Sequence, residues 1–167
     1  VRHIRLTDSV RNQLSRLRRV QWLRLPKETT AEDLPWLGQL TQLRGLSLSE
    51  SAMNGADFGA LRNLQSLQWL DLSLTVISGN DFETLPPLGS LQTLVLMGTD
   101  VTDQHLAHLA KLRLPSMTSL VVVGPSVSDA GVVQLCNSYN LEAFDLSNSS
   151  GVTGSCADAL GRMSNLR

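Results

Sequence analysis

One spacing of apolar residues recurs from end to end of the chain. An apolar residue is followed by a second three positions later and by a third two positions after that, as in LQWLDL (67–72) and LQTLVL (91–96). The last step alternates apolar and polar positions, which predicts a short strand with its leucines on one face. The pattern begins near residues 1, 20, 43, 67, 91, 117 and 141, and an eighth copy starts at residue 166, where it is truncated.

The second half of each unit has a longer period. Apolar residues follow the strand at intervals of five and then three positions, which predicts a turn and a helical or 3₁₀ segment. Thr102-Asp103 and Ser128-Asp129 place a hydroxyl N-cap before an acidic first turn. Leu85-Pro86-Pro87 excludes a long helix in the fourth unit. The expected core positions of these segments include Phe58, Phe82, Leu106, Val132 and Ala157.

Repeats with this consensus resemble those of the leucine-rich-repeat family, and the resemblance covers nearly all of residues 1–167. It implies an α/β solenoid, a single domain in which a right-handed superhelix lines its concave face with a parallel sheet. Val101-Thr102-Asp103 and Val127-Ser128-Asp129 are similar to the "V/I-T-D" class found in F-box-type and cysteine-containing repeats. The family often has Asn or Cys nine residues into the unit. Here hydroxyl residues replace them, except at Pro125, where we expect a different turn.

The charge is distributed unevenly along the chain. The formal net charge is −1, yet residues 1–27 contain eight basic residues and one acid, so the remaining 140 residues carry −8. The chain is therefore basic at one end and acidic along the rest. We expect Cys136 and Cys156 to be free thiols in repeat interiors, which weakly favours the cytoplasm or another reducing compartment.

The sequence predicts no catalysis, cofactor or metal. His105 and His108 are three residues apart, but the neighbouring leucines are the core positions, so we expect both histidines to face solvent. Asp71 and Asp145 occupy equivalent outward positions three units apart, or roughly 14 Å at the spacing of parallel strands, too far for a hydrolytic carboxylate pair. The chain contains no glycine-rich phosphate loop, nucleophile elbow or zinc motif.

The residues between the strand leucines point outward and define the predicted concave surface. Its N-terminal part is basic and aromatic, its middle combines tryptophan with aspartate, and its C-terminal part is an apolar block. Arginine and tryptophan are enriched at interface hot spots, and a contiguous apolar patch commonly marks a contact site. The candidate partner-binding residues are Trp22, Arg24, Trp69, Asp71, Val95, Met97, Val121 and Val123. The candidate basic end comprises Arg2, Arg5 and Arg44.

We therefore predict a non-catalytic protein–protein interaction scaffold that binds a protein or peptide on its concave face. The alternative is a substrate-recognition module of a larger multidomain protein, of the ubiquitin-ligase receptor or bacterial effector type. Nucleic-acid binding through the basic end is disfavoured by the acidic remainder, and no membrane partner is expected. For the apolar block, two alternatives to a partner contact stay open. A further segment or a second copy could cover it, or it could reflect only the general preference of valine for strands.

Overall fold

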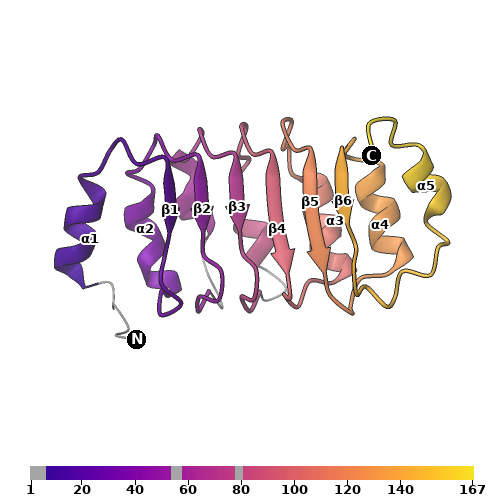
Figure 1. The fold of residues 1–167 in the computed structure, drawn as a ribbon, viewed down its shortest axis with the longest axis horizontal. Coiled ribbons are helices and arrows are strands. Elements are labelled where there is room, and N and C mark those ends of the chain that lie inside the picture. The colour runs from indigo at the N-terminus through magenta and orange to yellow at the C-terminus, as the bar shows by residue number, and fades with distance from the viewer. Residues whose placement is uncertain (1–6, 54–57, 78–80) are drawn as a thin grey trace.

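The computed structural model describes residues 7–53, 58–77 and 81–167. Six parallel strands form one sheet in sequence order, and the helical segments lie behind it along the long axis of the molecule (Figure 1). The strands are β1 (Trp22–Arg24), β2 (Gly45–Ser47), β3 (Trp69–Asp71), β4 (Thr93–Met97), β5 (Ser119–Val123) and β6 (Ala143–Asp145). The predicted strand of the first unit, with Arg2 and Arg5, lies outside the described residues.

The register of the sheet is the one that the repeats predict. Leu46, Leu70, Leu94 and Leu120 face one another on neighbouring strands and are fully buried. Burying a leucine side chain contributes about 1.5–3 kcal/mol, so this ladder is a main source of stability. The outward positions fall into register as well, which places the predicted partner-binding side chains of β1 to β5 on one face. We call it the concave face, as in the prediction.

The connecting segments vary between units, as the sequence predicts. Helices of nine and eight residues follow the hydroxyl N-caps Thr102 and Ser128, whereas the segment before Pro86-Pro87 is only a 3₁₀ turn. The helical elements are α1 (Asp8–Ser15), η1 (Ala31–Asp33), α2 (Leu34–Leu37), η2 (Phe58–Asn63), η3 (Asp81–Thr84), α3 (Asp103–Lys111), α4 (Asp129–Cys136) and α5 (Ala157–Gly161). In the described part of the chain, none of these is long and apolar enough to cross a bilayer.

The aspartate that opens α3 or α4 connects its unit to the next one. The Asp103 carboxylate accepts hydrogen bonds from Ser128 N (2.9 Å) and Oγ (2.5 Å). The Asp129 carboxylate likewise accepts from Thr153 Oγ1 (2.6 Å) and from Cys156 N (3.1 Å). The bonds from Thr153, followed by those from Cys156, hold the pKa of Asp129 far below its usual range. The acidic residue of the V/I-T-D pattern thus fixes the stacking of adjacent units as well as the start of its own helix.

The hydroxyl position after each strand also has a defined role. Thr75 Oγ1 donates to the carbonyl of Leu72 (2.5 Å), and Thr99 Oγ1 donates to that of Leu96 (2.7 Å). Pro125 offers neither a hydroxyl nor an N–H, and the sixth unit differs as predicted. Its strand carbonyl, that of Val122, is instead 3.5 Å from the hydroxyl of Ser149 in the next unit. The bond is thus supplied from the neighbouring unit.

One predicted core position in the last unit is wrong. Ala157 is exposed, and the buried residues there are Cys156 and Ala159. The loop before α5 turns at Gly154, which has φ +102°, and is held by Asp129. This turn shifts the inward-facing position by one residue relative to the repeat spacing.

Candidate binding surface on the concave face

Two tryptophans from strands that are not neighbours meet at the N-terminal end of the concave face. Trp22 on β1 and Trp69 on β3 have ring centroids 6.0 Å apart at a tilt of 45°. Gly45 of β2 lies between them in the register, and a Cβ at Gly45 would fall 2.8 Å from Trp22 Cδ2 and closer still to other ring atoms. The missing side chain on β2 therefore leaves the space into which the Trp22 ring folds. Because Trp22 remains 62% exposed, the pair presents an aromatic surface to solvent.

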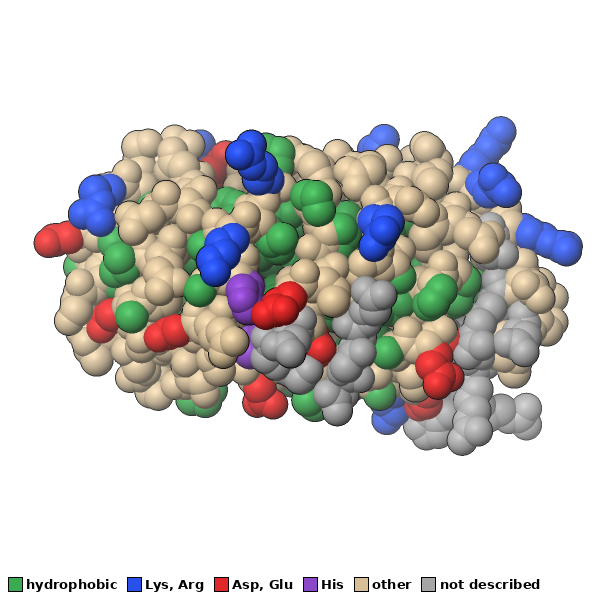
Figure 2. All heavy atoms as spheres, turned by 180° about the vertical axis from the view of Figure 1, so that it is seen from behind, with side chains coloured by type: hydrophobic (Ala, Val, Ile, Leu, Met, Phe, Trp, Pro, Cys, Tyr) green, Lys and Arg blue, Asp and Glu red, His purple; other side chains and the backbone are tan. Residues whose placement is uncertain are grey.

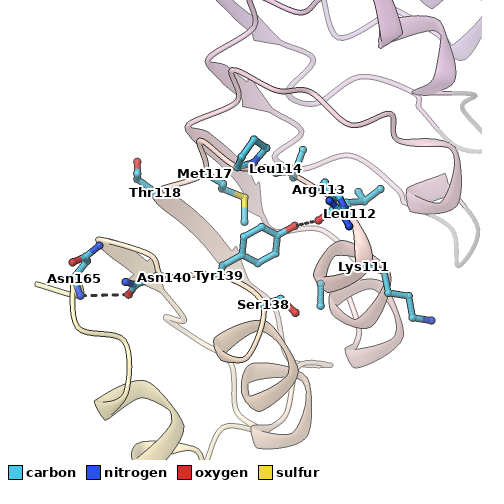
Figure 3. Close-up of a pocket in the computed structure, with 12 residues that line it drawn as sticks. Lys111, Leu112, Arg113, Leu114, Met117, Thr118, Ser138, Tyr139, Asn140 and Asn165 are labelled. Carbon is cyan, nitrogen blue, oxygen red and sulfur yellow. Dashed lines mark hydrogen bonds between the residues drawn. The ribbon is translucent and has the colours of Figure 1, made fainter.

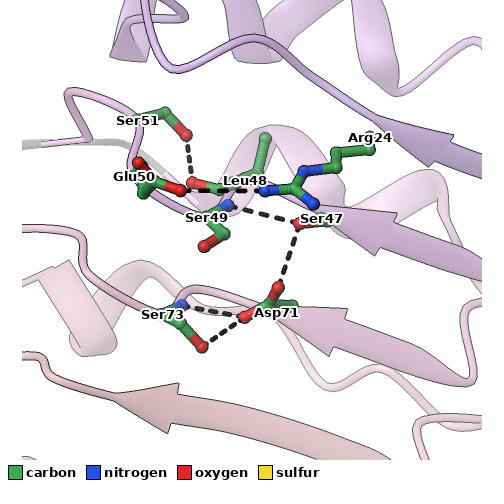
Figure 4. Close-up of polar contacts among 8 residues, drawn as sticks. All are labelled: Arg24, Ser47, Leu48, Ser49, Glu50, Ser51, Asp71 and Ser73. Atoms are coloured by element: carbon green, nitrogen blue, oxygen red, sulfur yellow. Dashed lines mark hydrogen bonds and ion pairs between the residues drawn. The ribbon is translucent and has the colours of Figure 1, made fainter.

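Polar side chains next to the tryptophan pair are linked by hydrogen bonds and an ion pair. The Asp71 carboxylate accepts hydrogen bonds from Ser47 Oγ at 3.0 Å and from Ser73 N at 2.9 Å (Figure 4). Arg24 is 3.7 Å from the carboxylate of Glu50, and both side chains are largely exposed. Surface ion pairs of this kind contribute little stability, so Glu50 does not hold Arg24 firmly in place. Asp71 is more firmly held, because it accepts these two hydrogen bonds and one of the donors, Ser47, is buried.

The apolar block consists of Val95, Met97, Val121 and Val123. Val95 is directly opposite Val121 and Met97 directly opposite Val123 in the β4–β5 register. The three valines are half-buried, and Met97 is 47% exposed. These side chains therefore form one contiguous apolar surface of two strands, as the repeat alignment predicts.

Leu74 enlarges the apolar block at the carboxyl ends of the strands. It is 55% exposed, and a Cβ at Gly98 would lie 2.6 Å from its Cδ2, so the leucine side chain extends across Gly98 beside Met97. The backbone of Leu74 is left-handed, with φ 56°, a conformation that costs a bulky residue about 1 kcal/mol. The exposed Leu74 side chain therefore adds to the apolar surface beside Met97.

A carboxylate bounds the block on its C-terminal side. Asp145 pairs with Val121 in the register of β5 and β6. Its carboxylate accepts from Ser147 N at 2.8 Å, and the bonds from Ser147 hold the pKa of Asp145 below its usual value. Asp145 is therefore ionised at neutral pH. The concave face is thus aromatic and basic at one end, apolar in its middle and acidic at the other end.

The predicted basic end is only partly described. Arg44 precedes β2, its side chain is exposed, and its carbonyl accepts from Trp69 N at 2.9 Å. It therefore borders the tryptophan pair. Arg2 and Arg5 lie outside the described residues, so their part in this surface stays a prediction.

The two histidines differ from the expectation that both face solvent. His105 is 4% exposed, and its Nδ1 accepts a hydrogen bond from Thr102 N (3.1 Å), so it closes the first turn of α3 in the manner of a capping box. Its ring also contacts Phe82 edge-on at 5.6 Å between centroids. His108 Nε2 is 3.4 Å from Glu83 Oε1 on the helical side of the molecule, where histidine side chains lie beside an acidic one (Figure 2).

These contacts assign the histidines to helix capping and unit packing. Within residues 7–53, 58–77 and 81–167, no three or more His, Cys, Asp or Glu side chains cluster as a metal site would require. Cys136 and Cys156 are free thiols, and burial raises the pKa of Cys156 to about 11.

Sequence reasoning missed three features of this surface. The contact between Trp22 and Trp69 could have been anticipated, because glycine at the outward position of β2 is the one place where a ring can cross a strand. The exposure of Leu74 follows from the left-handed turn, a position that Glu50, Gly98 and Asn148 occupy in other units. The capping role of His105 was hidden because Glu or Gln usually occupies that position.

Comparison with known proteins gives the fold and no more. Neither a protein-family profile nor a curated protein sequence matches the chain. Among solved structures, an internalin from Listeria monocytogenes matches with a TM-score of 0.58 and 20% identity over 80% of this chain. The match spans 36% of the internalin. The leucine-rich-repeat ectodomain of the receptor kinase SOBIR1 from Arabidopsis thaliana matches at a TM-score of 0.37 and 20% identity, over 71% of this chain and 62% of that one.

The likeness to the internalin, a leucine-rich-repeat protein, agrees with the repeat spacing, the single parallel sheet and the leucine ladder. The predicted fold class is therefore confirmed. The narrower assignment to the "V/I-T-D" class stays a prediction. In fold, this chain is a leucine-rich-repeat solenoid.

Proposed function

We propose that the chain is a non-catalytic scaffold that binds a protein or peptide on its concave face. The observation that carries this proposal is the exposed apolar surface formed by the apolar block and Leu74, with the exposed tryptophan pair on the same face of the sheet. Large apolar surfaces exposed on soluble proteins usually mark contact sites, and tryptophan is prominent among residues that dominate binding energy. The leucine-rich-repeat fold supports a general role in protein–protein interaction.

The rigidity of the sheet favours binding by this face. The outward side chains of β4 and β5 are fixed by five consecutive register pairs. Binding a partner therefore costs little conformational entropy at these side chains, and preorganisation of this kind improves affinity. The charge gradient along the face, from Arg24 and Arg44 to Asp145, would set the direction in which an extended ligand lies.

The test replaces the centre of the apolar block. In Val95→Asp/Val121→Asp, two carboxylates replace half-buried methyl groups, and we expect the partner that the wild-type chain captures from native lysate to be lost. Val95→Thr/Val121→Thr keeps the branched shape and should lose only part of the binding. Equal capture by the wild type and the Asp variant, with both folded by circular dichroism, would refute this location of the site.

The alternative function, a substrate-recognition module of a larger multidomain protein, uses the same face. The Val101-Thr102-Asp103 pattern, similar to that of F-box-type repeats, favours it. The domain content of the complete gene product is the test. Absence of a ligase-recruiting or effector domain there would eliminate the alternative and leave the scaffold proposal intact.

A further inference from the structure

A hollow lies away from the concave face, where the helical segments return to the strands of the fifth to seventh units (Figure 3). Its volume is about 870 Å³. The fifth unit spans 26 residues, from 91 to 116, whereas its neighbours span 24. The return segment 112–117 is correspondingly long, and the hollow opens between it and the end of the sixth unit at Tyr139. We call this hollow the Tyr139 groove.

The floor of the Tyr139 groove is apolar and fixed. Leu114 and Met117 are buried in the core. The Tyr139 hydroxyl, 2.7 Å from the carbonyl oxygens of both Leu109 and Leu112, shares its proton between them. This tie holds the ring against the fifth unit, and burial raises the pKa of Tyr139 to about 12, so the hydroxyl stays a donor.

The return segment is also anchored on its outer side. Ser116 Oγ donates to the Gly89 carbonyl at 2.8 Å, and Met117 N donates to that of Leu114 at 3.0 Å. The groove therefore exists before any ligand arrives. A preformed groove spares a ligand the cost of ordering the loop.

The rim of the groove is cationic, although this part of the chain is acidic. Residues 91–167 contain six acidic and four basic side chains. Lys111 and Arg113 line the Tyr139 groove, and Arg162 lines an adjoining hollow of about 330 Å³ that shares Ser138, Tyr139 and Asn140 with it. Three of the four basic residues thus border the two hollows, and none of the six acidic residues lines either of them. The rim of the groove is therefore more positively charged than the rest of this part of the chain.

We propose that the Tyr139 groove binds an acidic peptide segment. Carboxylates of the peptide pair with Lys111, Arg113 and Arg162, and an apolar side chain between them rests on Tyr139 and Met117. The side-chain amide of Asn165 at the open end of the groove supplies a donor and an acceptor for the peptide backbone, while the Asn140 amide is already bonded to Ser164 Oγ and Asn165 N. Guanidinium groups suit carboxylates because they can bond both oxygens at once.

A peptide fits the groove better than nucleic acid does. Single-stranded nucleic acid needs several exposed aromatic faces on which successive bases stack, in addition to cations. Among the described residues, Tyr139 is the one aromatic side chain that lines the groove, and its ring is half-buried with the hydroxyl bound inward. The combination of an apolar floor with a cationic rim matches a peptide in which acidic residues flank an apolar one.

Fluorescence anisotropy with a fluorescein-labelled EDELEDE peptide tests this inference on the whole 167-residue chain. We expect saturable binding that weakens at least tenfold in Lys111→Glu/Arg113→Glu. The matched control Arg19→Glu/Lys27→Glu changes the net charge equally at exposed positions far from the groove and should bind within twofold of wild type. Val95→Asp/Val121→Asp should also bind normally, so failure of this inference and failure of the proposed concave-face function can be told apart.

Four outcomes would overturn the inference. They are absence of saturable binding by folded protein, equal loss in the control variant, undiminished binding of an EDESEDE peptide, and tighter binding of a decathymidine strand than of EDELEDE. The third would reduce the groove to an unspecific anion site, and the fourth would make the ligand a nucleic acid. Lys111→Gln/Arg113→Gln, which adds no negative charge, should give an intermediate affinity and guards against misfolding of the reversal variant.

Discussion

The substitution Gly45→Ala tests how the tryptophan pair is built. The new methyl group would occupy the space of the Trp22 ring, 2.8 Å from Cδ2 and closer to Cε3 and Cζ3. Carbon atoms prefer to be 3.5–4.0 Å apart, so the ring must move by roughly 1.5 Å or leave β2 altogether. Trp22 is largely exposed and free to rotate outward. We expect the 6.0 Å contact with Trp69 to be lost while the sheet stays intact.

The effect on stability is expected to be small because two contributions oppose each other. Alanine is favoured over glycine in a strand by roughly 0.5–1 kcal/mol. Loss of the aromatic pair costs about 0.5–1.5 kcal/mol beyond the area that it buries. The net change in the free energy of unfolding of Gly45→Ala should therefore be within about 1 kcal/mol of zero, which shifts Tm by at most about 4 °C in a chain of this size.

Circular dichroism measures both parts of the prediction. Two tryptophans at this separation couple their transitions, so wild type should show a couplet in the far ultraviolet that is absent from Gly45→Ala and from the control Trp22→Phe. Melting curves recorded on the same samples give Tm. A retained couplet in Gly45→Ala would mean that the ring does not rest on Gly45. A fall in Tm of more than about 10 °C would mean that glycine is needed by the backbone itself rather than by the ring.

Three further substitutions or treatments probe the stacking of units. Gly131→Ala should destabilise the chain by about 1–3 kcal/mol in denaturant titrations although alanine favours helices, because its Cβ would lie 2.9 Å from Asp103 Cγ and closer to Oδ1. Asp129→Asn should flatten the acid side of the Tm–pH profile. The bonds from Thr153 lower the folded-state pKa of Asp129, so they stabilise the fold above about pH 4, and that contribution is lost as pH falls through the folded-state value. Cys156, 1% exposed and with its pKa raised to about 11, should react with iodoacetamide at about pH 8 only after unfolding.

Each of these has a control. Ala130→Gly is the control for Gly131→Ala, because it lowers helix propensity at an exposed neighbouring position. If Gly131→Ala is more stable than wild type, the steric explanation is wrong. For the carboxylate, Asp158→Asn removes an exposed acid in the same region, and an identical pH profile for Asp129→Asn and wild type would contradict the role of the inter-unit bonds. Rapid labelling of Cys156 in native protein would show that the last unit opens readily.

The fold could be predicted from the sequence because each unit repeats the same physical requirement. A strand leucine such as Leu94 is buried only if its equivalents on both neighbouring strands are in register, so seven copies of one spacing determine one sheet. The local signals were likewise sufficient to tell two connecting segments apart. Pro86-Pro87 predicted the short 3₁₀ segment, and Thr102-Asp103 predicted the start of an α-helix.

The surface was harder to predict because it depends on side chains that reach across units. Trp22 crosses a strand because of a glycine in the next unit, and Asp129 bonds a loop that begins 24 residues later. His105 turns inward to cap its own helix, although its position in the helix predicted exposure. Such contacts follow from local geometry and not from the periodicity that reveals the fold. The positions of outward residues were therefore predictable, whereas their exposure and mutual contacts were not.

Site-specific photo-crosslinking tests the central claim most directly. A benzoylphenylalanine at Ser119 would lie on the concave face next to the apolar block, and one at Gln134 would lie on the exposed side of α4, away from that face. If the chain binds its partner as proposed, the partner captured from lysate should crosslink to position 119 and not to position 134. Crosslinking from position 134 with none from position 119 would contradict binding on the concave face.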